Sequence, residues 1–134
     1  MKAFFDTNIL VYAATSDVKK RRAADCLEQG GVVSVQVFNE FVHVARRKFR
    51  LAWPQIELAL SQFQISLDDV LPIALTTHNS AVAIARDYQL SFFDALIVAA
   101  ALEAGCDTLY SEDMQHGQTF GSLRIENPFD QRSP

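Results

Sequence analysis

The chain opens with a short apolar run, Ala3–Phe5, that ends abruptly in Asp6. An apolar run without polar alternation is typical of a strand buried on both faces, as in the interior of a parallel sheet. Ligands of such open sheets bind in the crevice at the carboxyl ends of the strands. This stretch therefore predicts a parallel sheet with Asp6 at its ligand-binding edge. The same residues also fit an ordinary strand-to-helix turn, in which Asp6 or Thr7 only caps a helix.

Strands and helices alternate along the rest of the chain. Short apolar or β-branched runs predict strands at 32–35, 70–73, 108–110 and 123–125. Helical periodicity predicts helices at 17–29, 36–50, from Trp53-Pro54 onward, at 76–89 and at 95–104. Pro72 cannot donate to a strand ladder, so its strand belongs at a sheet edge. This alternation predicts an α/β fold with three layers, α/β/α, around a central, mostly parallel sheet of about four to five strands.

Length and composition fit one globular domain over residues 1–134, with a tail after about residue 127 that we expect to be flexible. Hydrophobic residues make up 49% of the chain and charged residues 21%, as is ordinary for a globular protein. The wholly apolar run 95–102 is too short to cross a membrane and predicts a buried helix. Cys26 and Cys106 lack metal-ligand spacing and are interpreted as core residues of a cytoplasmic protein.

The basic residues are unevenly distributed. The net charge of −4 argues mildly against a nucleic-acid partner, but residues 1–50 hold 9 Lys or Arg against 5 Asp or Glu. Local clusters matter more than the total, because attraction to phosphate is screened within about 8–10 Å. Two clusters are candidates for guiding RNA: Lys19, Lys20, Arg21 and Arg22, and Arg46, Arg47, Lys48 and Arg50. Each cluster by itself also fits a solvated helix face.

Four acidic residues stand at equivalent places in the predicted sheet, at strand ends or helix starts: Asp6, Glu40, Asp94 and Asp113. Because the carboxyl ends of parallel strands share one edge, we expect these side chains to converge. Carboxylates so close together repel one another at pH 7 unless a cation neutralises them. Oxygen ligands without paired His or Cys indicate Mg²⁺ or Mn²⁺. A metal held in this way can generate a nucleophilic water at a phosphodiester.

Each carboxylate alone also has a purely structural interpretation. Asp94 lies three residues after Ser91, as in a capping box. Glu40 could pair with His43 or Arg47 on an exposed helix face, and Asp113 could belong to a plain turn. Together, however, these interpretations require several independent coincidences.

The acidic residues lie in four short motifs, which are FFDTNIL at 4–10, VFNEF at 37–41, LSFFDALI at 90–97 and LYSEDM at 109–114. In order, spacing and structural setting, these motifs resemble those of PIN domains. The chain is most similar to the VapC-type toxin ribonucleases of prokaryotic toxin–antitoxin pairs. The resemblance covers nearly the whole chain.

The resemblance implies an endoribonuclease that depends on Mg²⁺ or Mn²⁺, is usually a homodimer and is silenced by a partner antitoxin protein. The catalytic and metal-binding set that it implies is Asp6, Glu40, Asp94 and Asp113. Asn8 and Ser111 fall where the family has supporting polar groups. Glu112 offers a second carboxylate beside Asp113, so the identity of the fourth acidic ligand stays open.

Our hypothesis from the sequence is a single α/β domain that hydrolyses RNA by metal-activated water. Asp6, Asp94 and Asp113 would hold the metal, with Glu40 as a further ligand or as the base that orients water. A catalytically silent RNA- or protein-binding module of the same fold is the alternative. A phosphoacceptor signalling module would need a lysine near the strand at 108–110, where none stands. An aspartate-nucleophile phosphatase would need an acid two places after Asp6, where Asn8 stands.

Overall fold

The structure, a computed structural model, describes residues 2–130. Within them the strands are β1 (Ala3–Phe5), β2 (Val32–Ser34), β3 (Asp69–Leu71), β4 (Thr108–Tyr110), β5 (Thr119–Phe120) and β6 (Leu123–Glu126). The helices are α1 (Thr7–Ala14), α2 (Lys20–Glu28), α3 (Val35–Arg47), α4 (Trp53–Ser66), α5 (Leu75–Tyr88) and α6 (Phe92–Glu103). Strands and helices thus alternate as the sequence predicts.

The strands form a single sheet in the order β3-β2-β1-β4-β6-β5. All neighbouring strands are parallel except β5 and β6, which are antiparallel. The first strand lies inside the sheet, where Phe4 and Phe5 pair with Leu109 and Tyr110 of β4. As predicted from the neighbouring Pro72, β3 lies at an edge. The sheet has one strand more than the sequence predicts, because β5 has two residues and shows no strand periodicity.

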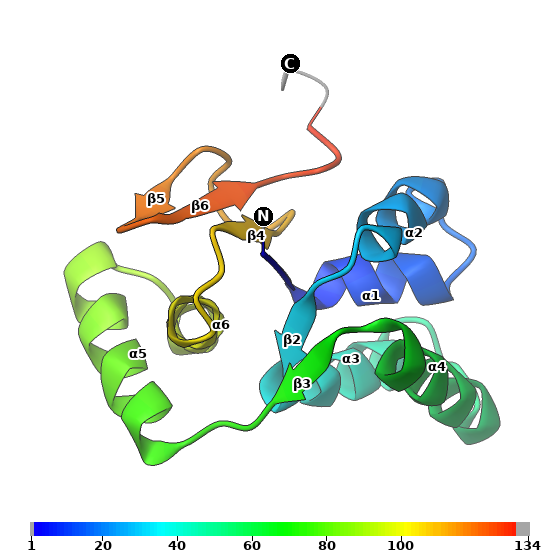
Figure 1. The fold of residues 1–134 in the computed structure, drawn as a ribbon. Coiled ribbons are helices and arrows are strands. Elements are labelled where there is room, and N and C mark those ends of the chain that lie inside the picture. Colours follow the sequence, from blue (N-terminus) through cyan, green and yellow to red (C-terminus); the bar gives the residue numbers. More distant parts are fainter. Residues whose placement is uncertain (1, 131–134) are drawn as a thin grey trace.

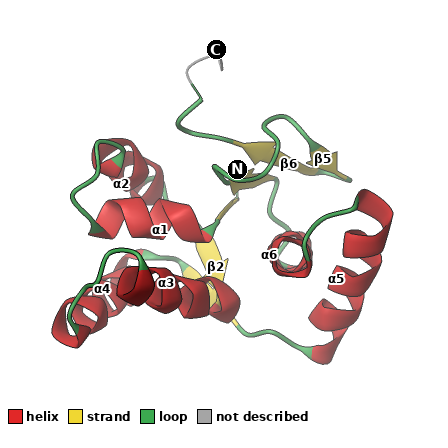
Figure 2. Ribbon diagram, turned by 180° about the vertical axis from the view of Figure 1, so that it is seen from behind, coloured by secondary structure: helices red, strands yellow, loops and turns green. Residues whose placement is uncertain are grey.

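Helices cover both faces of this sheet, which confirms the three-layer α/β/α architecture. In Figure 1, α1 to α4 lie on one side of the strands and α5 and α6 lie on the other. Figure 2 shows the same division from behind, with α6 seen end-on beside α5. The two helices α5 and α6 pack closely against each other.

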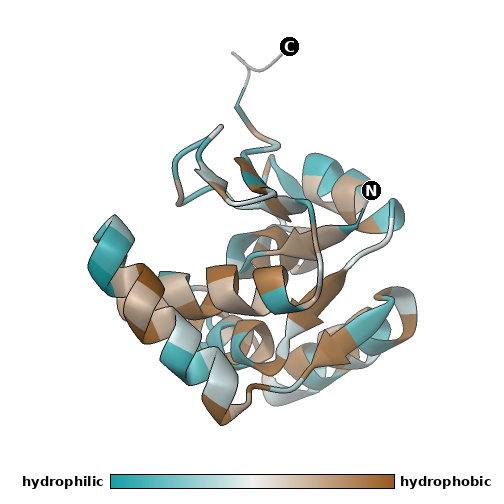
Figure 3. Ribbon diagram, turned by 60° about the vertical axis from the view of Figure 1, so that its left-hand side comes forward, coloured by the Kyte–Doolittle hydropathy of each residue, from teal (hydrophilic) through white to brown (hydrophobic). Residues whose placement is uncertain are grey.

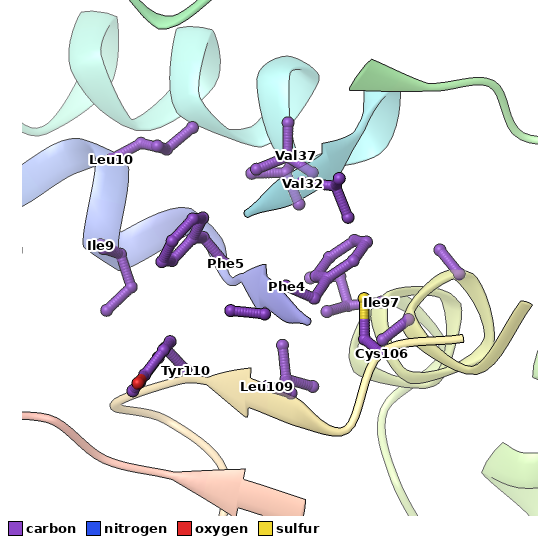
Figure 4. Close-up of a cluster of buried hydrophobic side chains, with 14 of the residues drawn as sticks. Phe4, Phe5, Ile9, Leu10, Val32, Val37, Ile97, Cys106, Leu109 and Tyr110 are labelled. Carbon is purple, nitrogen blue, oxygen red and sulfur yellow. The ribbon is translucent and has the colours of Figure 1, made fainter. Parts of the chain in front are cut away.

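The core forms where the central strands meet the helices. Figure 4 shows Phe4 and Phe5 of β1 among side chains from α1, α3, α6 and β4, and both rings are fully buried. Residues 95–101 of α6 are all buried, as expected for an apolar helix between the sheet and α5. In Figure 3 the central strands are coloured mostly hydrophobic, and hydrophilic colours lie mainly on outer helices and loops. Cys26 and Cys106 are buried free thiols in this core.

The approach of β2 to β1 depends on Gly31. A β-carbon at this position would lie 2.6 Å from Cε2 of Phe5 and 2.7 Å from the carbonyl oxygen of Ala3. Because both distances are shorter than a real Cβ contact, a side chain at Gly31 would push the two strands apart. This glycine therefore lets the amino end of β2 lie close to β1, at the end of the strands opposite to Asp6 and the start of α3.

Several helix and strand boundaries differ from the sequence prediction by a few residues. Helix α6 begins at Phe92 rather than at residue 95, which places Asp94 inside its first turn. At the other end of the chain, the ring of Phe129 packs edge-on against Tyr12 with centroids 5.3 Å apart. Arg22 Nε donates to the carbonyl of Pro128 at 2.9 Å. The rest of the tail for which we expected flexibility, residues 131–134, lies outside the described residues.

No helix in the described part of the chain is both long enough and apolar enough to cross a membrane.

Candidate active site

Asp6 occupies the junction between β1 and α1. It is the N-cap of α1, and its carboxylate accepts a hydrogen bond of 2.6 Å from the backbone N–H of Thr7. Its second oxygen accepts a hydrogen bond of 2.6 Å from the hydroxyl of Ser111, which follows β4. Ser111 Oγ in turn accepts from the backbone N–H of Met114 at 3.2 Å. Asp6 therefore caps α1 and also ties the ends of two neighbouring strands together.

The environment of Asp6 disfavours its charged form. The side chain is only 4% exposed, and burial raises its pKa from an ordinary 3.8 to about 7. The hydrogen bonds from Ser111 and Thr7 oppose this rise, whereas the negative charges of Asp94 and Glu40 add to it. A buried carboxylate with like charges around it is a strong candidate for a functional group.

Glu40 lies on α3, one turn into the helix that follows β2, and faces Asp6 across Thr7. The hydroxyl of Thr7 donates to Glu40 Oε1 at 3.4 Å, and Gln36 Nε2 donates to Oε2 at 3.1 Å. Burial raises the pKa of Glu40, and the charges of Asp94 and Asp113 raise it further. The pairing with Arg47 considered above is absent from the ion pairs of the described residues.

Asp94 lies in the first turn of α6, where its backbone N–H donates to Ser91 Oγ at 3.2 Å. Burial raises the pKa of its carboxyl group, and the charge of Asp113 adds to the rise, against a smaller opposing effect of Ser91. The cap contact and a role in an acidic site therefore coexist at this residue. Asp113 itself is exposed, in the loop after β4.

The four predicted acidic residues thus share one electrostatic environment at the carboxyl edge of the sheet: Asp6, Glu40, Asp94 and Asp113. In the described residues, neither of the ion pairs involves any of them. Hard oxygen donors with uncompensated negative charge have the chemistry that Mg²⁺ or Mn²⁺ requires. As the side chains stand in residues 2–130, however, no three acidic, imidazole or thiol groups are close enough together to hold an ion.

Glu112 differs from its neighbour Asp113 in its surroundings. Its carboxylate forms an ion pair with Lys19 and accepts a hydrogen bond of 2.5 Å from the hydroxyl of Tyr12. The backbone N–H of Glu112 donates to Asn8 Oδ1 at 3.4 Å, while Asn8 Nδ2 is buried without a hydrogen-bond partner in the described residues. Glu112 is therefore neutralised by a cation, whereas the charge of Asp113 acts on Glu40 and Asp94.

The first basic cluster lies at the start of α2, and the second lies at the end of α3 and just beyond it. In the first, Lys19 is engaged with Glu112, whereas Lys20 and Arg21 are exposed. In the second, Arg46 donates to the carbonyl of Leu51 at 3.0 Å and lies 4.7 Å from the centroid of the Trp53 ring. Also exposed are Arg22, Arg47, Lys48 and Arg50. Neither cluster neutralises the four carboxylates through an ion pair within the described residues.

Three residues that contact the site were not among the site residues predicted from the sequence. Thr7 bridges Asp6 and Glu40, and Gln36 holds the outer oxygen of Glu40. Tyr12 anchors Glu112 from α1. Thr7 could have been inferred from its place directly after Asp6, and Gln36 from its spacing of one helical turn before Glu40. The contact of Tyr12 joins residues that are 100 positions apart, so no local pattern signals it.

Comparison with solved structures finds the same fold in several toxins and toxin–antitoxin complexes. VapC20 of Mycobacterium tuberculosis, a toxin that cleaves the sarcin-ricin loop, superposes with a TM-score of 0.72 at 18% identity, over 84% of this chain and 90% of that one. A toxin–antitoxin complex from Klebsiella pneumoniae superposes with a TM-score of 0.74 at 22% identity, over 96% of this chain and 99% of that one. VapBC2 from Rickettsia felis, bound to a promoter DNA fragment, superposes with a TM-score of 0.69 at 19% identity, over 95% of this chain and 98% of that one.

These likenesses establish the fold, and the sequence itself establishes the family. No curated protein matches the chain at a significant level. The PIN domain family model, in contrast, matches residues 3–119, from β1 to the beginning of β5. Because this match includes all four acidic positions and most of the chain, the protein belongs to the PIN domain family.

Proposed function

We propose that this protein is a metal-dependent endoribonuclease that hydrolyses RNA phosphodiester bonds and serves as the toxin of a toxin–antitoxin pair. The observation that carries the proposal is the set of four carboxylates that includes the buried Asp6 and has no ion-pair partner within the described residues. Membership of the PIN domain family supports nuclease chemistry at this set. Hydrolysis by metal-activated water is the reaction for which such oxygen donors are suited.

Asp6, Asp94 and Asp113 would hold Mg²⁺ or Mn²⁺, because their charges act on one another and lack cationic partners. The bound cation supplies a nucleophilic water and offsets the negative charge that develops on the phosphate oxygens. Glu40 would be a further ligand or the base that orients this water, and burial raises its pKa, which makes its carboxylate a stronger base. Thr7 and Gln36 fix the position of Glu40 for either role.

Glu112 has a supporting role in this proposal, since its ion pair with Lys19 competes with metal binding. Its bond to Tyr12 fastens the loop that carries Ser111 and Asp113 to α1. Asn8 Nδ2, a buried donor without a partner in the described residues, is free to bind a phosphate oxygen or water. We therefore assign the fourth acidic position to Asp113.

The biological partners are inferred from the structural relatives. The Klebsiella pneumoniae and Rickettsia felis structures are toxin–antitoxin assemblies. We propose that this chain likewise binds a cognate antitoxin protein and acts as a cytoplasmic homodimer. A catalytically silent RNA- or protein-binding module is the second candidate. It is favoured by one observation, namely that no three acidic, imidazole or thiol groups in residues 2–130 are preassembled to hold an ion.

Incubating the purified protein with structured RNA tests the chemistry directly. Cleavage should require Mg²⁺ or Mn²⁺, should stop when EDTA is added and should resume when the metal is restored in excess. The reason is that hydrolysis needs a cation to generate the nucleophile and to offset phosphate charge. Persistent cleavage in EDTA would contradict the mechanism, and RNA binding without cleavage in either metal would favour the silent module.

The basic clusters should contribute a salt-dependent part of RNA binding. Replacing Arg46, Arg47 and Lys48 together by Gln should flatten the plot of log affinity against log salt concentration. Each lost contact with a single-stranded phosphate lowers the slope by about 0.7. Fluorescence anisotropy at several salt concentrations in EDTA measures this slope. The matched control is Arg86→Gln, since Arg86 is exposed on α5 and paired with Asp87. Equal slopes for the triple variant and the control would show that the cluster is only a solvated helix face.

A further inference from the structure

A hollow beside the acidic set is lined by Glu40 and Gln36 and by four side chains that the proposed reaction leaves unused. It lies between α3 and the start of α6, has a volume of about 380 Å³ and is open to solvent. Its lining consists of Gln36, Asn39, Glu40, His43, Val44 and Phe93. Glu40 belongs both to this α3–α6 pocket and to the acidic set. Whatever occupies the pocket therefore lies next to the carboxylates.

Phe93 is the aromatic wall of the α3–α6 pocket. The residue directly precedes Asp94 on α6 and is 58% exposed, although the rest of this helix is rich in buried apolar residues. Its neighbour Phe92 packs edge-on against His78, at 5.4 Å between centroids. The ring of Phe93 contacts that of Phe92, with centroids 6.1 Å apart, and the remainder of the Phe93 ring is exposed to solvent. Packing of the core does not account for a large aromatic side chain at this position.

The polar groups of the pocket are suited to a neutral, flat ligand with hydrogen-bonding edges. Asn39 and His43 are exposed on the same helix as Glu40, and amide and imidazole groups both donate and accept hydrogen bonds. The lining contains Glu40 but no Lys or Arg, so a phosphate group would be repelled from it. An uncharged ring that stacks on Phe93 meets no such repulsion.

From this geometry we propose that the α3–α6 pocket holds one unpaired base of the RNA substrate, stacked on Phe93, with Asn39 and His43 at its edge. The inference rests on the proposed ribonuclease function and specifies where one base of the RNA substrate binds. Sequence-selective recognition of RNA commonly uses splayed bases that stack on aromatic side chains and hydrogen-bond along their edges. Because Glu40 lines both the pocket and the acidic set, the bound base belongs to a nucleotide adjoining the cleaved phosphate.

Binding of a short single-stranded RNA, measured by fluorescence anisotropy in EDTA, separates recognition from cleavage. Phe93→Ala should weaken binding about 5- to 150-fold, the range expected when one stacked base loses its aromatic partner. Phe93→Tyr should bind like the wild type because it retains the ring. The matched control is Leu58→Ala on α4, since Leu58 is 60% exposed and lies outside the pocket lining. This control should leave binding unchanged.

Oligonucleotides that lack one base at a time locate the occupant of the pocket. At one position, loss of the base should weaken binding to the wild type but not to Phe93→Ala, because the two changes remove the same contact. The proposal would be overturned if Phe93→Ala bound RNA as tightly as the wild type does. It would also be overturned if, at every position, the effects of base removal and of Phe93→Ala on binding were additive. Either result would leave the ribonuclease function intact. If Phe93→Ala lost antitoxin binding but bound RNA like the wild type, the pocket would be assigned to a peptide. This result would also overturn the proposal of a bound base. Failure of the wild type to bind any RNA would overturn both proposals.

Discussion

Replacing Asp6 or Asp94 by Asn should lower the rate of RNA cleavage by at least about a hundredfold, the order of effect expected when one electrostatic group at a reaction centre is lost. Asn has nearly the shape of Asp but lacks the negative charge that would hold a divalent cation. Asp6 is the more deeply buried of the two, and its charge interacts with those of Asp94 and Glu40. Removal of either charge should therefore weaken metal binding and slow hydrolysis together.

Single-turnover cleavage at saturating Mn²⁺ measures this effect without a contribution from product release. The matched control is Asp68→Asn, because Asp68 is an exposed acid between α4 and β3 that lies outside the acidic set. Its variant should cleave RNA within a few-fold of the wild type. If Asp94→Asn instead behaved like this control, the role of Asp94 would be limited to the first turn of α6, where its backbone bonds Ser91.

The sequence was most informative where local pattern and topology agree. Ala3–Phe5 is buried throughout, and Asp6 follows it at the sheet edge, as the apolar run and its abrupt end predict. Once the parallel order of strands is inferred, the convergence of acidic residues follows, since carboxyl ends of parallel strands meet at one edge. Glu40 and Asp94 needed only an assignment of the helices that carry them.

The remaining features depend on contacts that no local pattern encodes. The sequence could not decide between Glu112 and Asp113, because the difference arises from Lys19 and Tyr12 on α1 and its following loop. The two-residue strand β5 exists through its pairing with β6 and has no periodicity of its own. The α3–α6 pocket forms between helices that are far apart in the chain, so no local pattern singles out Phe93.

Without metal, the wild-type protein should become less stable as the pH rises from about 4 to about 7. The unfolded chain releases the proton of Asp6 near the ordinary pKa of 3.8, whereas the folded protein retains it up to about 7. The folded state thus binds more protons than the unfolded state across this window. The stabilisation that protonated Asp6 contributes is therefore fully present below pH 3.8 and is lost above pH 7. At 1.36 kcal/mol per pKa unit, the loss is on the order of 4 kcal/mol. The raised pKa values of Glu40 and Asp94 act in the same direction.

Asp6→Asn isolates this contribution, because Asn resembles the protonated side chain at every pH. In EDTA at pH 8, the variant should be more stable than the wild type in urea denaturation, and its stability should fall less between pH 4 and pH 7. The control is Asp87→Asn, an exposed residue whose pKa is lowered by its bond to Arg86, so its loss cannot flatten the slope. Metal at a hundred times its dissociation constant should stabilise the wild type by about 2.7 kcal/mol and Asp6→Asn far less. If Asp6→Asn were instead less stable in EDTA at pH 8 and equally responsive to metal, the carboxylate would serve only as the cap of α1 and the tie to Ser111.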